Sequence, residues 1–460
     1  MEADRRAELT AIVGEANAAF APDLHPDDLR DESLHPTGAM PWAVAHPAST
    51  AEVAAVARLA AREGLSVTAR GSGTGLSGAA APLEGGLVVA FDRMDAVLRV
   101  DVDDHVAVVQ PGVTLRALDE ALAGTGLHYP VYPGELSGSI GGNVNTNAGG
   151  MRAVRHGVTR HHVVGLELVL ADGTVVRTGG PVVKSSTGYD LTQLVIGSEG
   201  TLALVTEVTL RLSPRLEHAT TVLVPYDDVE RITAVVPRLV ASGLEPSILE
   251  YIDALVMAAI TAAAGLTLGV EASVAASASA YLVVVLETRT ADQLDADLAA
   301  LAGLLETSGA LDVYVLGART GAALVEARER AFWTAKAAGV NDVVDVVVPR
   351  SRVADFLAET AKRAAERGAL VSGCGHVGDG NVHVSVFLGD DVERAALLRD
   401  LCSYAVSLGG QVSGEHGVGV DKRADVLALA DPAWLELQAR VKAAFDPAGR
   451  LNPGRGAVPG

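Results

Sequence analysis

The sequence is poor in cysteine and in aromatic residues, and it contains no run of basic residues. Only two of its 460 residues are cysteines, Cys374 and Cys402, which excludes a disulfide framework and suits a reducing cytosol. Aromatic residues make up 4% of the chain, and its formal net charge is −21. A charge of this sign disfavours nonspecific binding to nucleic acid or to an anionic membrane. We therefore expect no nucleic-acid partner.

The sequence also lacks a clear membrane-directed segment. Its first residues, MEADRRAELTAIVGEA, have no apolar core of the kind found in signal peptides. The least polar run, residues 261–286, carries Glu271 and ends in YLVVVLE, which favours a helix or loop followed by a buried strand over a membrane span. We expect a cytoplasmic protein, and peripheral docking on the inner face of the membrane stays open.

Length and patterning predict a multidomain α+β protein. A chain of 460 residues with 49% hydrophobic residues has room for two large domains or three ordinary ones. Short strands and helices follow one another without regular βαβ alternation. Pro214 and Pro225 flank a change of character near residue 215, which we take as a domain boundary.

The first of two glycine-rich segments is GSGTGLSG, residues 71–78. Gly73, Gly75 and Gly78 match G-x-G-x-x-G, so a Rossmann dinucleotide site must be considered. A Rossmann motif opens a helix, however, whereas here Pro82 and a second glycine pair follow and lead to a strand, LVVAF. We therefore favour a glycine loop between two strands, whose backbone N–H groups can surround a pyrophosphate.

The second segment is PGELSGSIGGNVNTNAGG, residues 133–150, which we expect to form a long loop. Its glycines let the backbone approach a ligand closely, and its Ser and Asn side chains offer neutral hydrogen bonds. Such loops suit the phosphates and the flat ring of a large nucleotide. The motif GSEGTL at residues 197–202 strengthens that interpretation.

These motifs, together with QPGV, GCGHVGDGNVHVSV, SGEHGVGVDKR and LNPG, resemble the FAD-linked oxidase / D-2-hydroxy acid dehydrogenase family. That family contains D-lactate dehydrogenase, the FAD subunit of glycolate oxidase and D-2-hydroxyglutarate dehydrogenase. The resemblance covers about residues 37–455 and implies the vanillyl-alcohol oxidase / p-cresol methylhydroxylase fold. In that fold, an FAD-binding domain of two subdomains is joined to an α+β substrate (cap) domain, and a C-terminal segment returns to the FAD domain.

The resemblance divides the chain into four parts. We predict an N-terminal helical segment (1–36), an FAD-binding domain (37–214), a substrate domain with a metal site (215–420) and a C-terminal segment (421–460).

The resemblance also implies which residues contact FAD. The first glycine segment would hold the pyrophosphate, the second would lie beside the flavin, and the GSEGTL region would lie at the adenine side. Some relatives attach the flavin covalently through a His or Cys in the first segment, which has neither here, so we expect non-covalent FAD. The implied residues are Arg70, Gly71, Ser72, Gly73, Thr74, Gly75, Gly78, Pro133, Gly134, Ser137, Gly138, Ile140, Gly141, Gly142, Asn143, Asn147, Gly149, Gly150, Gly197, Glu199, Gly200, Val205 and Asn452.

Two histidines, His376 and His383, flank the turn-rich sequence GDGN. If VGDGNV forms a hairpin with a four-residue loop at 378–381, His376 lies directly opposite His383, with Cβ atoms roughly 5 Å apart. That spacing suits two imidazoles on one metal ion. A hydrogen-bonded pair of core histidines is the alternative.

A third ligand is available in SGEHG, where Glu415 supplies a carboxylate. Three protein ligands leave an open position for substrate, as in catalytic metal sites, and the resemblance points to the same three residues. Zinc is our first choice, with manganese and ferrous iron left open. The neighbouring His416 would be free to act as a general base near neutral pH, and a surface-loop residue is the alternative for it.

The resemblance completes the site with Arg328, to hold a substrate carboxylate, and Asn381, to contact the substrate. A charge on a helix surface is the alternative for Arg328. The implied reaction converts a small D-2-hydroxy acid into its 2-oxo acid, with His416 accepting the hydroxyl proton and FAD the hydride. Val343 stands where the hydroxyglutarate branch has a carboxylate-reading lysine, which favours D-lactate or glycolate, although Lys336 could reach in from another position.

Nothing in the sequence resembles a heme site or an iron–sulfur cysteine cluster. Electrons would therefore leave to an external acceptor, namely oxygen, a quinone, a cytochrome or an electron-transfer flavoprotein. The alternatives are a D-2-hydroxyglutarate dehydrogenase, an FAD oxidase of another alcohol, and a non-catalytic FAD-binding subunit of a multi-subunit glycolate oxidase. A homodimer stays open.

Overall fold

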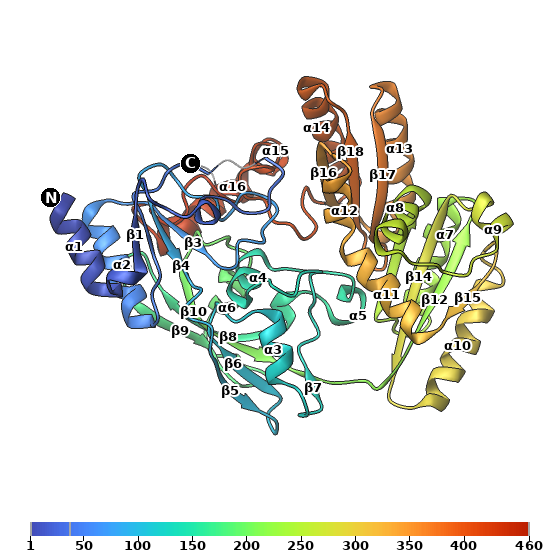
Figure 1. Cartoon of the computed structure of the whole chain (residues 1–460), viewed down its shortest axis with the longest axis horizontal. Coiled ribbons are helices and arrows are strands. Elements are labelled where there is room, and N and C mark those ends of the chain that lie inside the picture. The colour runs from blue at the N-terminus through green and yellow to red at the C-terminus, as the bar shows by residue number, and fades with distance from the viewer. Residues whose placement is uncertain (1, 36–37, 459–460) are drawn as a thin grey trace.

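The computed structural model describes residues 2–35 and 38–458 and has two parts (Figure 1). The blue-to-green part contains the first three sheets, and the yellow-to-orange part contains one large sheet. Two short strands, β7 (Leu127–His128) and β11 (Ser213–Pro214), pair with each other just before the chain enters the large sheet. Within the described ranges, no helix is long and apolar enough to span a membrane.

A four-stranded sheet carries the first glycine segment. Its strands, in spatial order, are β1 (Ala18–Phe20), β2 (Ala43–Ala45), β4 (Leu87–Ala90) and β3 (Val67–Arg70). Because β3 ends at Arg70 and the next strand begins at Leu87, the segment between them is a loop between parallel strands, as the sequence predicts. Two helices pack beside this sheet, α1 (Glu2–Val13) and α2 (Thr50–Glu63), and the Ser49 side chain caps the latter by accepting from the Glu52 N–H.

A five-stranded antiparallel sheet holds the second glycine segment. Its strands, in spatial order, are β5 (Val97–Asp101), β6 (Val106–Val109), β10 (Leu204–Arg211), β8 (Val163–Val169) and β9 (Val175–Gly179). The helices of this region are α3 (Leu115–Ala121), α4 (Ile140–Thr146), α5 (Ala153–His156) and α6 (Leu191–Val195). The prediction of one long loop at 133–150 is wrong in its middle, because Ser139 caps α4 by accepting from the Gly142 N–H.

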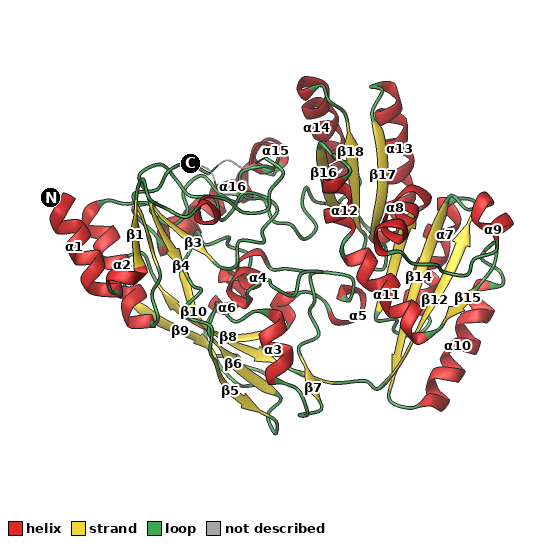
Figure 2. Ribbon diagram, in the orientation of Figure 1, coloured by secondary structure: helices red, strands yellow, loops and turns green. Residues whose placement is uncertain are grey.

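The second part is built on a seven-stranded sheet. Its strands, in spatial order, are β15 (Tyr314–Leu316), β12 (His218–Tyr226), β14 (Ala280–Thr288), β13 (Ile248–Asp253), β17 (Leu370–His376), β18 (Asn381–Phe387) and β16 (Asp342–Val347). All but one residue of β14 are buried, because helices cover both faces of the sheet (Figure 2). The apolar run that raised the membrane question is therefore the end of a helix, a second short helix and this buried strand.

The two faces of the seven-stranded sheet have different helices. One face packs against α7 (Val229–Ala241), α10 (Ala291–Leu305), α13 (Val353–Glu366) and α14 (Asp391–Ser407). Near the other face lie α8 (Ala254–Ala264), α9 (Ala272–Ser277), α11 (Ala318–Glu329) and α12 (Ala331–Ala337). Short 3-10 turns complete the described elements: Glu15–Asn17, Pro26–Leu29, Thr159–His161 and Arg350–Arg352.

The C-terminal region returns to the first part, where α15 (Arg423–Leu429) and α16 (Pro432–Phe445) lie among the blue elements of Figure 1. Leu451 forms a parallel bridge to Val67 of β3, and the Asn452 side chain donates to the carbonyls of Ala79 and Glu199. The predicted α+β architecture and the returning segment are confirmed. The exact domain limits stay predictions.

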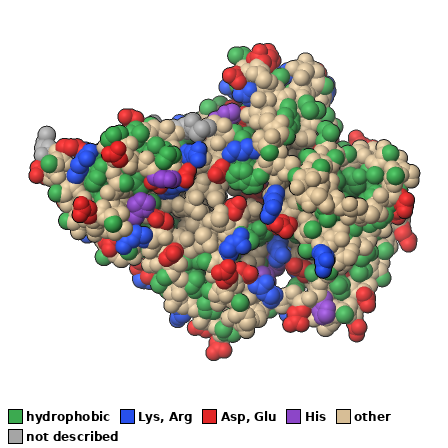
Figure 3. Space-filling model, viewed as in Figure 1, with side chains coloured by type: hydrophobic (Ala, Val, Ile, Leu, Met, Phe, Trp, Pro, Cys, Tyr) green, Lys and Arg blue, Asp and Glu red, His purple; other side chains and the backbone are tan. Residues whose placement is uncertain are grey.

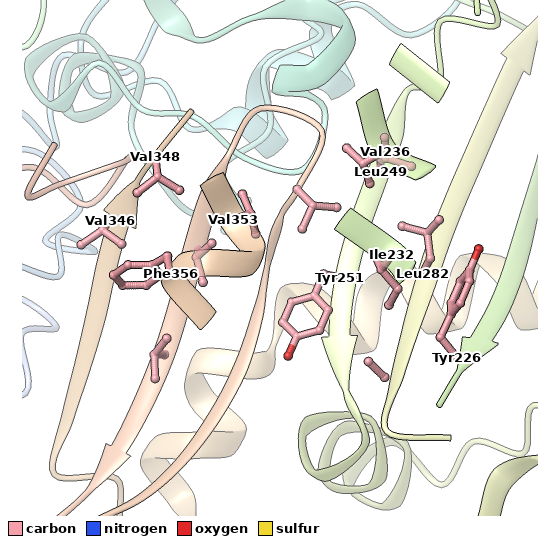
Figure 4. Close-up of a cluster of buried hydrophobic side chains, with 14 of the residues drawn as sticks. Tyr226, Ile232, Val236, Leu249, Tyr251, Leu282, Val346, Val348, Val353 and Phe356 are labelled. Atoms are coloured by element: carbon pink, nitrogen blue, oxygen red, sulfur yellow. The ribbon is translucent and has the colours of Figure 1, made fainter. Parts of the chain in front are cut away.

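A substitution of Phe356 tests how tightly the core beside the seven-stranded sheet is packed. Its side chain is fully buried beside Val346 and Val353 (Figure 4). Phe356→Ala should lower the free energy of unfolding of this part by about 3 to 5 kcal/mol, because the cavity left behind cannot close fully. Urea denaturation followed by circular dichroism measures the change. Val392→Ala, at a side chain that is 77% exposed, should stay within about 0.5 kcal/mol of the unchanged chain; an equal loss for both would contradict the packing account.

Candidate active site

The hairpin of β17 and β18 brings the two predicted histidines together, but not in the predicted register. His383 pairs with Cys374, and His376 pairs with Asn381, so the loop comprises residues 377–380. The predicted direct opposition of the two histidines is therefore wrong. They still share one face, because residues two apart on a strand point to the same side and His383 lies two positions beyond Asn381. The histidines are diagonal neighbours.

Three side-chain atoms converge at this place. His376 Nε2 and His383 Nε2 are 3.4 Å apart, and each lies 3.2 Å from Glu415 Oε1. Ligand atoms at zinc-bond lengths from one tetrahedral ion lie roughly 3.3 Å from one another. Two imidazoles and a carboxylate at these separations fit a divalent metal with an open position. The same separations also permit hydrogen bonds, which is the alternative that the sequence leaves open.

Two buried carboxylates support the histidines from behind. Glu250 on β13 lies 2.5 Å from His376 Nδ1, through Oε1, and Asp345 on β16 lies 3.7 Å from His383 Nδ1. Carboxylates behind metal-ligating histidines fix the ring orientation and raise the basicity of the ligand. Burial opposes ionisation of His376, but Glu250 and Glu415 outweigh it and raise the pKa of His376 well above its ordinary value.

His416 lies beside the three candidate ligands. Its ring stacks on that of His383 at 5.2 Å between centroids, and its Nδ1 lies 3.8 Å from Asp345 Oδ2. Burial is the main cause that lowers the pKa of His416 to about 4. The imidazole is therefore neutral at pH 7, and a pKa this far below neutral makes it a weaker base than an ordinary histidine.

A cavity of about 280 Å³ opens next to these groups. His376, His383, Glu415 and His416 line it, and so does Arg328. Arg328 is buried, and its Nη2 lies 2.8 Å from Glu250 Oε2. Its Nε has no hydrogen-bond partner within the described residues, so it is available to an anion in the cavity. The structure thus excludes the alternative of a charge on a helix surface.

Asn381 does not line this cavity. Its buried amide donates to Asp345 Oδ1 at 2.9 Å and to the carbonyl of Val346 at 2.8 Å. The predicted substrate contact is corrected: Asn381 lies behind the site and supports Asp345.

A second cavity, of about 190 Å³, lies between the two glycine segments. It shares Leu76, Pro133, Glu415 and His416 with the first, so the two cavities adjoin. Predicted FAD contacts that line it are Gly71, Ser72, Gly73, Thr74, Gly75, Pro133, Gly138, Gly141, Gly142, Asn143, Gly149, Glu199, Gly200 and Val205. Gly134 and Gly150 line the first cavity instead.

The glycines make the second cavity possible. A Cβ on Gly71 would lie 2.1 Å from Ser139 Oγ, and one on Gly141 would lie 2.6 Å from Pro111 Cβ. The close approach of these loops therefore requires the missing side chains. Asn143 Nδ2 is buried in this wall without a partner among the described residues, which fits a donor meant for a bound ligand. These residues fit FAD.

Seven other predicted FAD contacts line neither cavity: Arg70, Gly78, Ser137, Ile140, Asn147, Gly197 and Asn452. Arg70 turns away and donates to the carbonyl of Arg30, while Ile140 is buried in a hydrophobic core. Glu199 does line the FAD cavity, yet its carboxylate accepts from the N–H groups of Val418 and Gly419.

Sequence reasoning missed Glu250, Asp345 and Leu76. The two acids lie within apolar strands, at places where sequence gives no sign of a partner. A charged residue inside a buried strand was the available signal, since buried carboxylates are rare without a partner. Leu76 lines both cavities from within the first glycine loop.

Comparisons with known proteins agree with this geometry. The sequence profile described as "FAD binding domain" matches residues 41–179, and that described as "FAD linked oxidases, C-terminal domain" matches residues 215–455. The chain is similar to an uncharacterized FAD-linked oxidoreductase of Mycobacterium tuberculosis, at 52% identity over 97% of this chain and 98% of the relative. It is also similar to D-lactate dehydrogenase of Archaeoglobus fulgidus, at 35% identity over 97% of this chain and 98% of the relative. A third relative is glycolate oxidase subunit GlcD of Bacillus subtilis, at 34% identity over 90% of this chain and 89% of the relative.

Among solved structures, p-cresol methylhydroxylase with substrate bound matches with a TM-score of 0.81 at 18% identity, over 99% of this chain and 96% of that one. This likeness concerns the fold. Fold and profiles together define a flavin-dependent oxidoreductase. The chain belongs to the family of FAD-linked oxidases, and the resemblance, the fold and FAD as the cofactor are thereby confirmed.

Glu329 offers a pH test beside the cavity. It lines the cavity, accepts from the Tyr132 hydroxyl at 2.9 Å, and has a pKa raised to about 7, chiefly by burial. Between pH 4.5 and about 7, the Glu329 carboxyl keeps its proton in the folded protein and loses it in the unfolded chain. The free energy of unfolding therefore falls as pH rises through this range. Glu329→Gln should reduce the fall in melting temperature across that range, measured on the FAD-loaded protein.

The matched control for Glu329 is Glu366→Gln, at an exposed position of α13 that is not among the groups acting on Glu329. It should keep the pH profile of the unchanged chain. If Glu329→Gln keeps that profile as well, the assignment of a raised pKa to Glu329 is wrong.

Proposed function

We propose that this chain oxidises a D-2-hydroxy acid to the 2-oxo acid and passes the electrons to an external acceptor. The observation that carries the proposal is the first cavity, where an arginine with an unpaired Nε donor, a neutral histidine and three converging ligand atoms surround one space beside the FAD cavity. The names of two relatives, D-lactate dehydrogenase and glycolate oxidase subunit GlcD, support the same class of substrate. D-lactate and glycolate are the first candidates.

The residues that line the first cavity would have different roles in the reaction. Arg328 would bind the substrate carboxylate in a charge-assisted, bidentate manner. His416 would accept the hydroxyl proton, and its stacking on His383 and its proximity to Asp345 hold the ring in place. Bound FAD supplies the acceptor for the hydride from C2, and a divalent metal at His376, His383 and Glu415, zinc as first choice, supplies a Lewis acid for the hydroxyl.

The lining of the first cavity supports 2-hydroxyglutarate less well than it supports D-lactate or glycolate. Val343 lines it where a lysine would be expected to meet the second carboxylate. Lys336 does not replace that lysine, because it lies outside the lining and its Nζ is 3.0 Å from Glu32 Oε2. Within the described lining, Arg328 is the single Lys or Arg.

A quinone, a cytochrome or an electron-transfer flavoprotein is the proposed electron acceptor, in a cytoplasmic protein. Figure 3 shows acidic and basic side chains interspersed across one face, which gives no reason to add nucleic acid to the partners. Solution mass measurement would settle whether the chain forms a homodimer.

Anaerobic flavin reduction tests the reaction. Purified protein carrying FAD should lose its visible flavin absorbance when D-lactate or glycolate is added without oxygen, because hydride transfer reduces the ring. The expected product is the 2-oxo acid, in equal amount to the reduced flavin. A flavin that stays oxidised with every D-2-hydroxy acid offered would contradict the proposal, since bound FAD would then be present without the chemistry.

His383→Ala tests the metal. It should lower the content of bound divalent metal, measured by mass spectrometry of the purified protein, and slow flavin reduction more than about 100-fold, while FAD stays bound. His105→Ala, at an exposed histidine in a turn, is the control and should keep both metal and rate. Full metal content in His383→Ala, or none in the unchanged protein, would leave hydrogen-bonded histidines as the correct interpretation.

A further inference from the structure

The first cavity extends well beyond the groups that the proposed reaction uses. At about 280 Å³ it would hold on the order of ten water molecules, more space than lactate or glycolate fills. Leu76, Pro133, Gly134 and Gly150 mark the end that adjoins the FAD cavity. The remainder lies beyond Arg328 and the histidines, among α8, α12 and the hairpin, and we name it the apolar arm.

The hairpin forms one wall of the apolar arm, and its side chains change character along the strands. On β18 the lining residues are His383, Ser385 and Phe387, which alternate onto one face. Their partners on β17 are Cys374, Ser372 and Leu370, in that order. The wall therefore runs from a histidine through a pair of serines to an apolar pair. With about 3.4 Å per residue, the distance from His383 to Phe387 is about 14 Å.

Helices α8 and α12, which pack on each other, supply the other wall. From α8 it takes Leu255, Val256, Ala259 and Ile260. From α12 it takes Ala331, Phe332, Thr334, Ala335 and Ala338, the last of which follows the helix end. The alanines leave room between the walls. Leu255 and Leu370 are each 57% exposed, so the arm opens to solvent at its far end.

The charges of the lining restrict what can enter. Arg328 is the single Lys or Arg in the described lining, and it lies at the reaction end beside Glu250. The acids are Glu415, at the reaction end, and Glu329. A second carboxylate in the arm would meet no cation and would lose its hydration. A hydrocarbon chain would instead replace water along the whole arm.

From this geometry we infer that the preferred substrate is a D-2-hydroxy monocarboxylic acid with an extended apolar side chain, which lies in the apolar arm. The inference rests on the proposed function and narrows it. Arg328 holds the carboxylate, the reacting carbon lies between His416 and the FAD cavity, and the side chain passes Ser385 and Val343 toward Phe387 and Leu370. D-lactate and glycolate are accepted, but they leave the arm filled with water.

A homologous series tests the inference. Anaerobic flavin reduction is followed with glycolate, D-lactate, D-2-hydroxybutanoate, D-2-hydroxyhexanoate and D-2-hydroxyoctanoate, and the ratio of limiting rate to dissociation constant is compared. Each buried methylene should raise that ratio about three- to fourfold until the arm is full. Calorimetric titration of the oxidised FAD-loaded protein with the matching 2-oxo acids should show the same trend in affinity without turnover.

Ala335→Phe tests whether the arm is the place where the chain lies. A phenyl ring at this position should fill part of the arm. It should lower the advantage of D-2-hydroxyoctanoate over D-lactate, measured as limiting rate divided by dissociation constant, at least tenfold. Ala337→Phe is the matched control, because Ala337 is exposed on the same helix and does not line the cavity. FAD content and melting temperature show whether each variant is folded. If Ala335→Phe does not fold, the substrate series with the unchanged protein tests the inference by itself.

The outcomes separate the two proposals. If D-lactate reduces the flavin but longer acids are no better, the inference is overturned and the proposed function stands. If longer acids are better but Ala335→Phe leaves their advantage intact, the arm is not their binding place and the inference is overturned. If no acid of the series reduces a bound flavin, the proposed function fails, and the inference fails with it.

Discussion

The site depends on one buried carboxylate, Asp345, in the edge strand β16. Its side chain is completely shielded from solvent. It accepts from Lys422 Nζ at 2.7 Å, from Ser413 Oγ at 2.9 Å, from the Asn381 amide at 2.9 Å and from the His416 N–H at 3.0 Å. Burying a charge is unfavourable unless it is paired and hydrogen-bonded, and these donors supply that compensation. Burial opposes ionisation, but His416 and Lys422 outweigh it and keep the pKa of Asp345 well below its ordinary value.

Because of these bonds, Asp345 joins the sheet to the turn that carries Glu415 and His416. The same turn is fastened to the FAD-binding part. Ser77, in the first glycine loop, donates to the carbonyl of His416, and Glu199 accepts from Val418 and Gly419. A turn held from both sides lets two domains contribute to one site with fixed geometry. Glu415 and His416 consequently face both cavities.

Much of this arrangement could be predicted from sequence, because its motifs are local. The first glycine segment was correctly placed between two strands, since Pro82 and the following strand are incompatible with a Rossmann helix. The hairpin was predicted too, and its histidines do meet. Its register was wrong, because a loop at 377–380 and one at 378–381 are compatible with the same glycines, and packing in the sheet decides between them.

Features that depend on distant partners could not be predicted in this way. Nothing local shows that Glu250 would lie between Arg328 and His376, or that Asn381 would turn inward to Asp345. The family resemblance placed Arg70 at the FAD pyrophosphate, yet its partner is the carbonyl of Arg30. The apolar arm is assembled from α8, α12 and the hairpin, three segments that meet only in the folded chain.

Anomalous X-ray diffraction from crystals of the FAD-loaded protein tests the central claim most directly. We expect one peak of a transition metal about 2 Å from His376 Nε2, His383 Nε2 and Glu415 Oε1, with the flavin density in the adjoining cavity. A peak that vanishes on the low-energy side of the zinc edge would identify zinc. Flavin density with no metal peak between these three atoms would contradict the account, because the residues would then form a hydrogen-bonded cluster.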